Sequence, residues 1–292
     1  MPPSEIQLPT TEASVNIRLL NGGSMTAEYH KLHAGELATE FRMYNWCFLI
    51  HHEQQGRWVL WDLGMSSNPD DYPPVIANGP IKEAKVQDPH ESIASQIERR
   101  SGVSADGQPP FFGPGTAEYC TPGHLTNPSP PWDGRYFDPE RATERWETLQ
   151  GPWIQFGPFE HAMNFFGDGS FWIIQAPGHM PGNLCACARL PSGEWVMLAS
   201  DCCHSRALLN GEKEFGMFKL PDENMFCLHM DIPAALDTLA RIRVMEKELG
   251  VHIALAHDST WMESERDSVL LSLLDDRILE NIRIALPQQQ PF

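Results

Sequence analysis

The stretch Ala176-Pro177-Gly178-His179-Met180-Pro181-Gly182 places a histidine in a turn directly after an apolar run, Ser170–Ala176. Two later apolar runs end in a similar way, one before Asp201 and the other before His257. Layered α/β folds commonly carry their functional side chains on the loops that follow strands. The glycines on either side of His179 permit a sharp backbone bend, which would let its imidazole turn toward a shared centre.

His179, Asp201 and His257 together form a candidate metal site. Two imidazoles and a carboxylate are ordinary zinc ligands. Taken singly, each histidine is more simply explained as a surface or capping residue, and turn chemistry explains Asp201 at least as well. Only the combination of the three residues favours a metal centre.

The rest of the chain alternates between strand patterns and helix patterns. Apolar runs bounded by turn residues predict strands, and apolar residues three or four apart predict helices. The predicted strands are Ser14–Leu20 (before an Asn21-Gly22-Gly23 turn), Tyr44–His52, Arg57–Leu63, Ser170–Ala176, Asn183–Leu190, Glu194–Ser200 and Val251–Ala256. The predicted helices are Glu91–Arg100, a helix capped by Asp231 with a buried stripe of Leu236, Leu239, Ile242, Met245 and Leu249, and a C-terminal helix, Ser264–Leu286.

This order of elements predicts one α/β domain, with sheets sandwiched between helices, over residues 15–292. Residues 1–14 are polar and read as a loose N-terminal tail. The segment Gln108–Pro131 contains seven prolines and reads as a surface loop.

The composition of the chain excludes some classes of partner and favours one cellular compartment. The formal net charge is −18, which repels phosphate backbones and anionic lipid surfaces, so we expect neither nucleic acid nor membranes as partners. Seven cysteines without a secreted-scaffold spacing are typical of reduced thiols. Cys185 and Cys187 share one face of a predicted strand and are more simply buried apolar residues than a metal or redox pair. Without a signal peptide or an apolar run of membrane-spanning length, we expect a cytoplasmic location.

The motifs resemble the metallo-β-lactamase superfamily. Pro177–Gly182, then an apolar hairpin, Ser200-Asp201 and His257-Asp258 look like the second half of that family, and Asp62-Leu63-Gly64 looks like its early Asp-x-Gly. The nearest likeness is to the lactonase-like branch that includes the N-acyl homoserine lactonases. The resemblance implies an αββα sandwich and one or two zinc ions, which activate water to attack an ester, lactone, thioester or amide carbonyl.

The resemblance also implies roles for single residues. His179 would bind a first zinc ion, Asp201 would bridge two ions, and His257 would bind the second. His204, three residues after Asp201, falls where lactonase relatives carry a substrate-facing polar residue, so we count Asp201 and His204 as candidate catalytic residues; a plain surface histidine is the alternative reading of His204.

One departure from the family is large: the His-x-His-x-Asp-His motif, which supplies four ligands, is absent. Only Ser101–Pro110 separates the predicted helix Glu91–Arg100 from Phe111, so a core strand is also expected to be missing, unless Phe111–Gly113 pairs in its place. His124 is a weak replacement ligand, because its surroundings resemble a substrate-side loop. Either the chain is a degenerate member of the family or the gene model or splice form omits coding sequence.

The leading hypothesis is a lactonase- or esterase-like hydrolase for a small molecule, with an incomplete zinc site. Three ligands spread over two sites leave neither with the three protein ligands that catalytic zinc normally keeps, which argues for low or no activity. Two alternatives stay open. One is an inactive binding or scaffold protein with this fold, and the other is a thioesterase of the glyoxalase-II type. The sequence indicates no oligomeric state.

Overall fold

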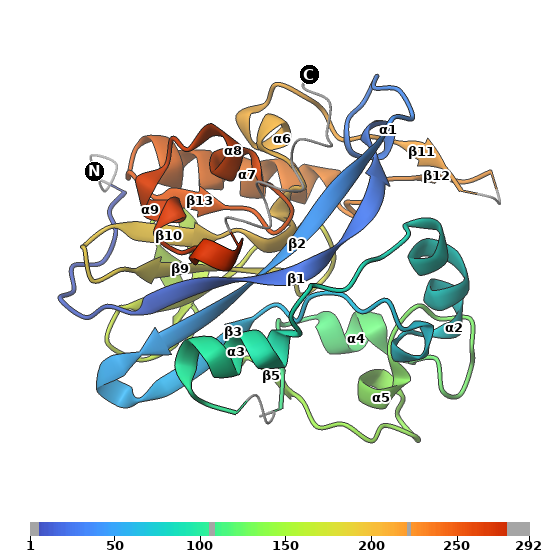
Figure 1. Cartoon of the computed structure of the whole chain (residues 1–292), viewed down its shortest axis with the longest axis horizontal. Coiled ribbons are helices and arrows are strands. Elements are labelled where there is room, and N and C mark those ends of the chain that lie inside the picture. The colour runs from blue at the N-terminus through green and yellow to red at the C-terminus, as the bar shows by residue number, and fades with distance from the viewer. Residues whose placement is uncertain (1–5, 105–108, 221–222, 279–292) are drawn as a thin grey trace.

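The computed structural model describes residues 6–104, 109–220 and 223–278, in which two β-sheets pack face to face between helices (Figure 1). One sheet is antiparallel and has the order β1 (Asn16–Glu28), β2 (Glu40–His52), β3 (Arg57–Trp61). The other has the order β13 (His252–Ala254), β10 (Trp195–Leu198), β9 (Leu184–Arg189), β8 (Phe171–Gln175), β7 (Phe159–Asn164), β6 (Ile154–Phe156). The predicted αββα sandwich is confirmed.

Alternation along β2 explains why its central stretch, Trp46–Ile50, is apolar without a break. Trp46, Phe48 and Ile50 are buried between the two sheets, whereas Cys47 and Leu49 face a separate cluster on the outer side of the first sheet. Successive side chains of a strand point to opposite faces, so a strand covered on both sides must be apolar at every position.

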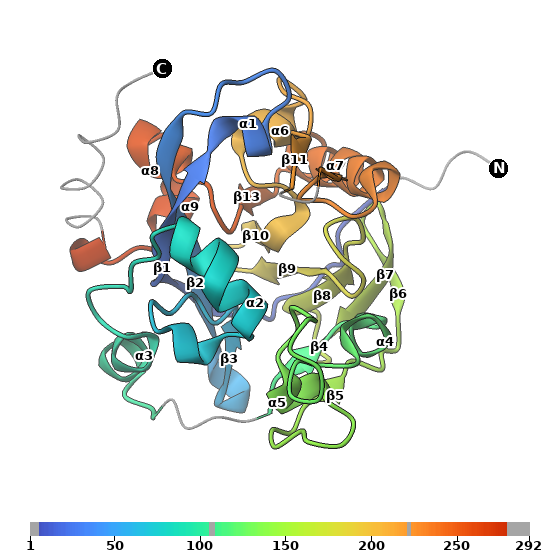
Figure 2. The same cartoon turned by 90° about the vertical axis from the view of Figure 1, so that its right-hand side faces the viewer.

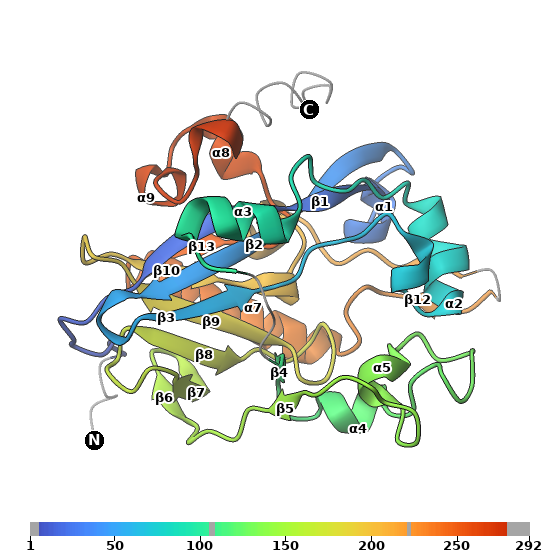
Figure 3. The same cartoon turned by 60° about the horizontal axis from the view of Figure 1, so that its bottom comes forward.

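Helices cover both outer faces of the sandwich (Figure 2, Figure 3). The helix α3 (Ile93–Ser101) lies across the first sheet, and α7 (Ile232–Lys247) packs on the second. The carboxylate of Asp231 caps α7 by accepting a hydrogen bond from the Ala234 backbone N–H (3.0 Å), as predicted. The predicted stripe is wrong at Leu236, which is half exposed, because Ala235 faces the sheet instead.

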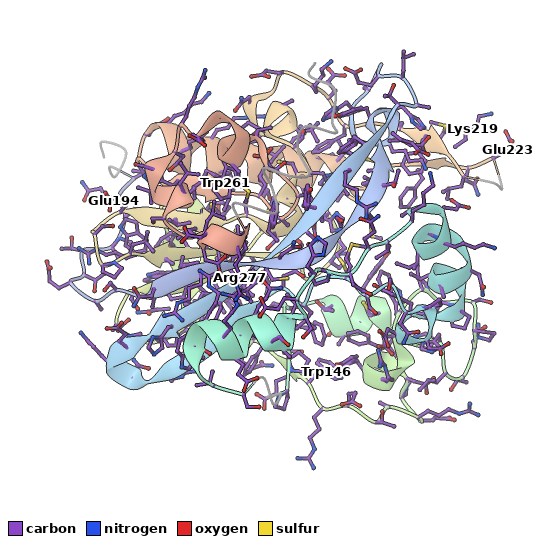
Figure 4. All side chains as sticks on the ribbon, viewed as in Figure 1. Trp146, Glu194, Lys219, Glu223, Trp261 and Arg277 are labelled. Atoms are coloured by element: carbon purple, nitrogen blue, oxygen red, sulfur yellow. The ribbon has the colours of Figure 1, made fainter. Side chains whose placement is uncertain are left out.

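The other elements are short. The helices are α1 (Tyr29–Leu32), α2 (Pro74–Ile76), α4 (Thr116–Cys120), α5 (Gly134–Phe137), α6 (Arg206–Asn210), α8 (Thr260–Ser264) and α9 (Ser268–Leu271). The strands β4 (Phe111–Phe112) and β5 (Glu147–Thr148) pair in parallel, and β11 (Phe218–Lys219) and β12 (Met225–Phe226) pair antiparallel. Single turns of 3₁₀ helix are Glu53–Gln55, Pro69–Asp71 and Ser200–Cys202, and Ala77–Ile81 is a π turn. Lys219 and Glu223 form an ion pair on the β11–β12 hairpin (2.8 Å; Figure 4).

Four sequence expectations need correction. The Asn21-Gly22-Gly23 segment is not a turn between elements, because β1 continues through it with a register shift against β2. Phe111–Gly113 does not take the place of a core strand, since Phe111 and Phe112 pair with β5 in a separate two-stranded sheet. The described part of the predicted C-terminal helix is interrupted after Ser264, and residues 279–286 of that prediction lie outside the described residues. The proline-rich surface loop contains both β4 and α4.

The predicted N-terminal tail is partly anchored. Residues 1–5 lie outside the described residues, and residues 6–14 contain neither helix nor strand. However, the Thr11 hydroxyl donates to the Asp168 carbonyl (2.7 Å), and the Arg189 guanidinium donates to the carbonyls of Glu12 and Ala13. These bonds hold the segment before β1 along the second sheet.

All seven cysteines are buried and unbridged. Cys185 and Cys187 are fully buried on the α7 side of β9, which confirms that they pack as small apolar residues. Among the described residues, no helix combines the length and the hydropathy that crossing a bilayer would require.

Candidate metal centre

Asp201 and His257 meet because two parallel strands end at the same edge of the second sheet. In the β10–β13 pairing, Leu198 lies opposite Ala254, and Asp201 and His257 each follow three residues later. The Nε2 atom of His257 lies 2.8 Å from Oδ1 of Asp201. The strand-end argument from the sequence therefore places these two side chains correctly.

The strand β2 fixes the loop that carries His257. The Nδ1 atom of His257 lies 2.8 Å from the Tyr44 carbonyl oxygen. The Trp46 backbone N–H donates to the Ala256 carbonyl (2.9 Å), and its indole N–H donates to the Asp258 carbonyl (3.1 Å). An Nδ1–H donated to a backbone carbonyl leaves Nε2 as the atom that faces the centre, which is the arrangement common to metal-binding histidines.

A tight turn after β10 positions Asp201. Ser200 has a φ of +47°, a left-handed conformation that non-glycine residues seldom adopt. Its hydroxyl oxygen accepts a hydrogen bond from the Trp61 indole N–H at the end of β3 (3.0 Å), and its carbonyl accepts from the Ala256 backbone N–H (3.3 Å). The first contact comes from β3 and the second from the loop that carries His257. Together they hold the turn so that Asp201 faces His257.

His179 is set by the close packing of its glycine neighbour on α7. Gly178 has a φ of +132°, and a Cβ atom there would lie 2.4 Å from the Ala235 Cα atom. The backbone N–H groups of Met230 and Asp231 donate to the carbonyls of His179 (3.1 Å) and Gly178 (3.0 Å). The segment before α7 is therefore bonded directly to the turn that carries His179.

This pairing brings a residue into the centre that the sequence analysis missed. His229 lies with its ring centroid 5.5 Å from that of His179 and 5.1 Å from that of His204. His204 also lies 5.4 Å from His179 and 5.3 Å from His257. We call the five side chains His179, Asp201, His204, His229 and His257 the histidine cluster.

The ligand atoms of part of this cluster already converge. One atom each from Asp201, His204 and His257 lie within 4.8 Å of one another. His204 is only 7% exposed, so the reading of it as a surface histidine is wrong. The sequence analysis expects two sites that are each short of ligands, and this shortage is not confirmed. The structure places two further imidazoles, those of His204 and His229, beside His179.

Burial and charge set the protonation of the cluster. Although burial opposes it, the hydrogen bond with Asp201 raises the pKa of His257 above its ordinary value. Burial likewise opposes ionisation of Asp201, but the His257 bond and the nearby imidazoles hold the pKa of Asp201 below its usual range. Burial lowers the pKa of His204 well below its ordinary value and that of His229 to about 4. His204 and His229 are therefore neutral at pH 7, which is the form that binds metals.

The donor set fits a divalent transition ion. Neither ring nitrogen of His229, nor Nδ1 of His179, has a hydrogen-bond partner among the residues that the structure describes, although all three atoms are buried. A buried polar atom without a partner costs roughly 1–3 kcal/mol. Imidazole nitrogens and a carboxylate are the ligands that zinc prefers, so a metal ion would satisfy atoms that the protein leaves unpaired.

Two further residues from the sequence analysis are Asp62 and His124. Asp62, in the Asp-x-Gly segment, is accessible to solvent and accepts hydrogen bonds from the Leu63 (2.6 Å) and Gly64 (3.1 Å) backbone N–H groups. Desolvation by the surrounding protein and the negative charge of Asp201 raise the pKa of Asp62. His124 is used elsewhere, since its Nδ1 accepts from the Gly134 backbone N–H (3.0 Å).

A pocket of about 280 Å³ lies next to the segment that carries His179 but not at the cluster. Pro177 and Gly182 line it together with polar side chains of β7, β8 and α7, among them Glu160, Gln175 and Arg241. No member of the histidine cluster lines this pocket, so its volume says nothing of substrate size at the metal centre.

No family model matches the chain. Among curated proteins, the metallo-hydrolase mfmC of Annulohypoxylon moriforme is 27% identical over 318 residues, covering 88% of this chain and 82% of that protein. The cytochrome P450 monooxygenase mpaDE' of Penicillium brevicompactum is 26% identical over 303 residues, covering 88% of this chain. The match spans only 35% of that longer protein.

Solved structures share the architecture at low sequence identity. An N-acyl homoserine lactone hydrolase with its product N-hexanoyl-L-homoserine at the catalytic metal centre has a TM-score of 0.61 and 14% identity. The alignment covers 86% of this chain and 96% of that one. The chain therefore has the fold of the metallo-β-lactamase superfamily and, within it, resembles the N-acyl homoserine lactonases.

Proposed function

We propose that this protein is a metal-dependent hydrolase that cleaves the acyl–oxygen bond of an ester or lactone in a small, largely apolar molecule. The observation that carries the proposal is the histidine cluster: four imidazoles and one carboxylate, gathered at the strand ends of a lactonase-type fold. The similarity to a curated metallo-hydrolase and to lactone hydrolases supports the reaction class.

His179 and Asp201 would hold the metal, as the resemblance implies, and His204 and His257 both lie close enough to join them. A bound zinc ion supplies Lewis-acid chemistry, because it lowers the pKa of water and polarises a carbonyl group. Asp201 contributes the negative charge that offsets the ion, and its side chain is 31% exposed, so the centre is open to water and substrate. Tyr44 and Ser200 hold His257 and the Asp201 turn in place.

The surroundings of the cluster favour an apolar substrate. Leu63, next to Asp62, is 67% exposed, and Met230, next to His229, is 46% exposed. The Tyr119 hydroxyl contacts the Met230 sulfur (2.9 Å), and its ring packs edge-on against Trp132. Met230 directly follows His229, and exposed apolar side chains beside a polar centre are typical of sites that bind apolar ligands.

A substrate panel tests the proposal directly. The zinc-loaded protein should hydrolyse acylated lactones or aryl esters, measured by proton release or by chromatography, and a chelator should abolish the rate. His161→Ala, on the exposed side of β7, should leave the rate unchanged and serves as the control. Preference for thioesters would instead support the glyoxalase-II-type reading. Tight binding of a ligand without turnover would contradict the proposal and support a binding protein.

A further inference from the structure

We propose that His229 is a metal ligand, and that it joins His179, His204 and Asp201 in a site for one divalent ion of the zinc class. This deepens the proposed function and rests on it for the presence of a metal at the cluster. In effect, the segment before α7 supplies part of what the absent His-x-His-x-Asp-His loop would have supplied.

The first argument is the state of the His229 side chain. It is 2% exposed, and neither of its ring nitrogens has a hydrogen-bond partner within the described parts of the chain. Apart from the other imidazoles, its ring packs on Phe215, with 4.2 Å between centroids. A purely structural residue at this position would be apolar, since unpaired buried nitrogens destabilise a fold and an apolar replacement of similar size would remove that cost.

The second argument is the spacing of the rings. His179, His204 and His229 form a triangle with sides of 5.4, 5.5 and 5.1 Å between centroids. Zn–N bonds of about 2.0–2.1 Å in a tetrahedral arrangement place the centroids of two bound imidazoles about 5 Å apart. Turning a ring about χ2 barely moves its centroid, so the spacing of the three rings stays compatible with one shared ion whichever nitrogen faces it.

The third argument is that the protein holds His229 in place. The Met230 backbone N–H bonds to the His179 carbonyl, and the His229 N–H donates to the Cys227 sulfur (3.4 Å). Preorganised ligands favour metal binding because little conformational entropy is lost when the ion arrives. The carboxylate of Asp201 lies against the same triangle through His204, with 3.8 Å between His204 Nε2 and Asp201 Oδ1.

Three imidazoles and one carboxylate also explain how the chain manages without the missing motif. Catalytic zinc can expand to five-coordinate, so an ion held by three imidazoles and Asp201 can still accept water or substrate. One ion per chain is then expected, because His204 belongs both to the triangle with His179 and His229 and to the group with Asp201 and His257.

The test compares His229→Leu with His161→Leu in the full-length protein, with zinc alone as the probe. We expect the wild type and H161L to bind one zinc ion per chain, and H229L to bind it about 100-fold or more weakly, in competition with a chelating dye. X-ray absorption of the zinc-loaded wild type should count three imidazoles. In the metal-free state, H229L should be at least as stable as the wild type, which a structural role for His229 would not allow.

The outcomes separate the two proposals. Zinc affinity of H229L within threefold of the wild type, or a count of only two imidazoles, would overturn the role of His229 even if the protein hydrolyses lactones. A wild type that binds one ion and loses it in H229L, but hydrolyses nothing, would leave the site intact and overturn the proposed function. A folded wild type that binds no zinc would overturn both.

Discussion

Replacing Asp201 by asparagine is expected to abolish hydrolysis and to strip the protein of metal. The amide keeps the size of the side chain but removes the negative charge that offsets the ion and that pairs with His257. Losing a ligand should weaken zinc binding about 100-fold or more. Removing a group that only hydrogen-bonds to a ligand already lowers metal affinity or activity 10–100-fold. Losing several kcal/mol of metal-assisted stabilisation corresponds to a rate about 1000-fold lower.

Elemental analysis of the dialysed variant and initial rates on the best substrate of the panel measure both effects. Asp237→Asn is a matched control, because Asp237 is an exposed carboxylate on α7 that pairs with Arg241 four residues later. That variant should keep its metal and its rate. If D201N retains the zinc content and the rate of the wild type, Asp201 is not part of the centre.

Gly178→Ala should be among the most destabilising single changes in the chain. Its Cβ atom would stand 2.4 Å from Ala235 Cα and 2.5 Å from Ala235 N, so α7 or the His179 turn must move. The φ of +132° belongs to a region that is essentially restricted to glycine. Strain and overpacking together should lower the free energy of unfolding by about 3 kcal/mol or more.

Denaturant unfolding of the metal-free variant measures this loss, and zinc titration reports the displacement of His179. Gly250→Ala is the control, since Gly250 also has a positive φ (+67°) but has open space around its Cβ position. It should lose only about 1 kcal/mol and keep its metal affinity. Equal losses in the two variants would mean that the contact with Ala235 does not constrain the His179 turn.

The sequence predicts the strand ends well, because their signals are local. Asp201 and His257 each follow an apolar run, and the parallel pairing of Leu198 with Ala254 converts those separate signals into a contact. Gly178 is similar, since the glycine is visible in the sequence as a bend, although only the structure shows that α7 requires it.

His229 could not be predicted in the same way. It follows the β11–β12 hairpin and no predicted strand, and it has no partner histidine at a ligand-like spacing in the sequence. The backbone N–H groups of the next two residues, Met230 and Asp231, bring it to the centre by bonding to His179 and Gly178. No repeating pattern in the sequence predicts these bonds. The deep burial of His204 is a tertiary effect of the same kind. It depends on the loops after β8, β10 and β13 and the segment before α7 packing together.

The most direct test of the central claim is the metal content per chain. It is measured by elemental analysis on the folded, monodisperse protein after dialysis from a zinc-containing buffer. We expect one zinc ion per chain, and an increase in the free energy of unfolding of about 2.7 kcal/mol when free zinc is 100 times the dissociation constant. A folded protein that retains no zinc and is not stabilised by it would contradict the account, and the histidine cluster would then belong to a binding protein.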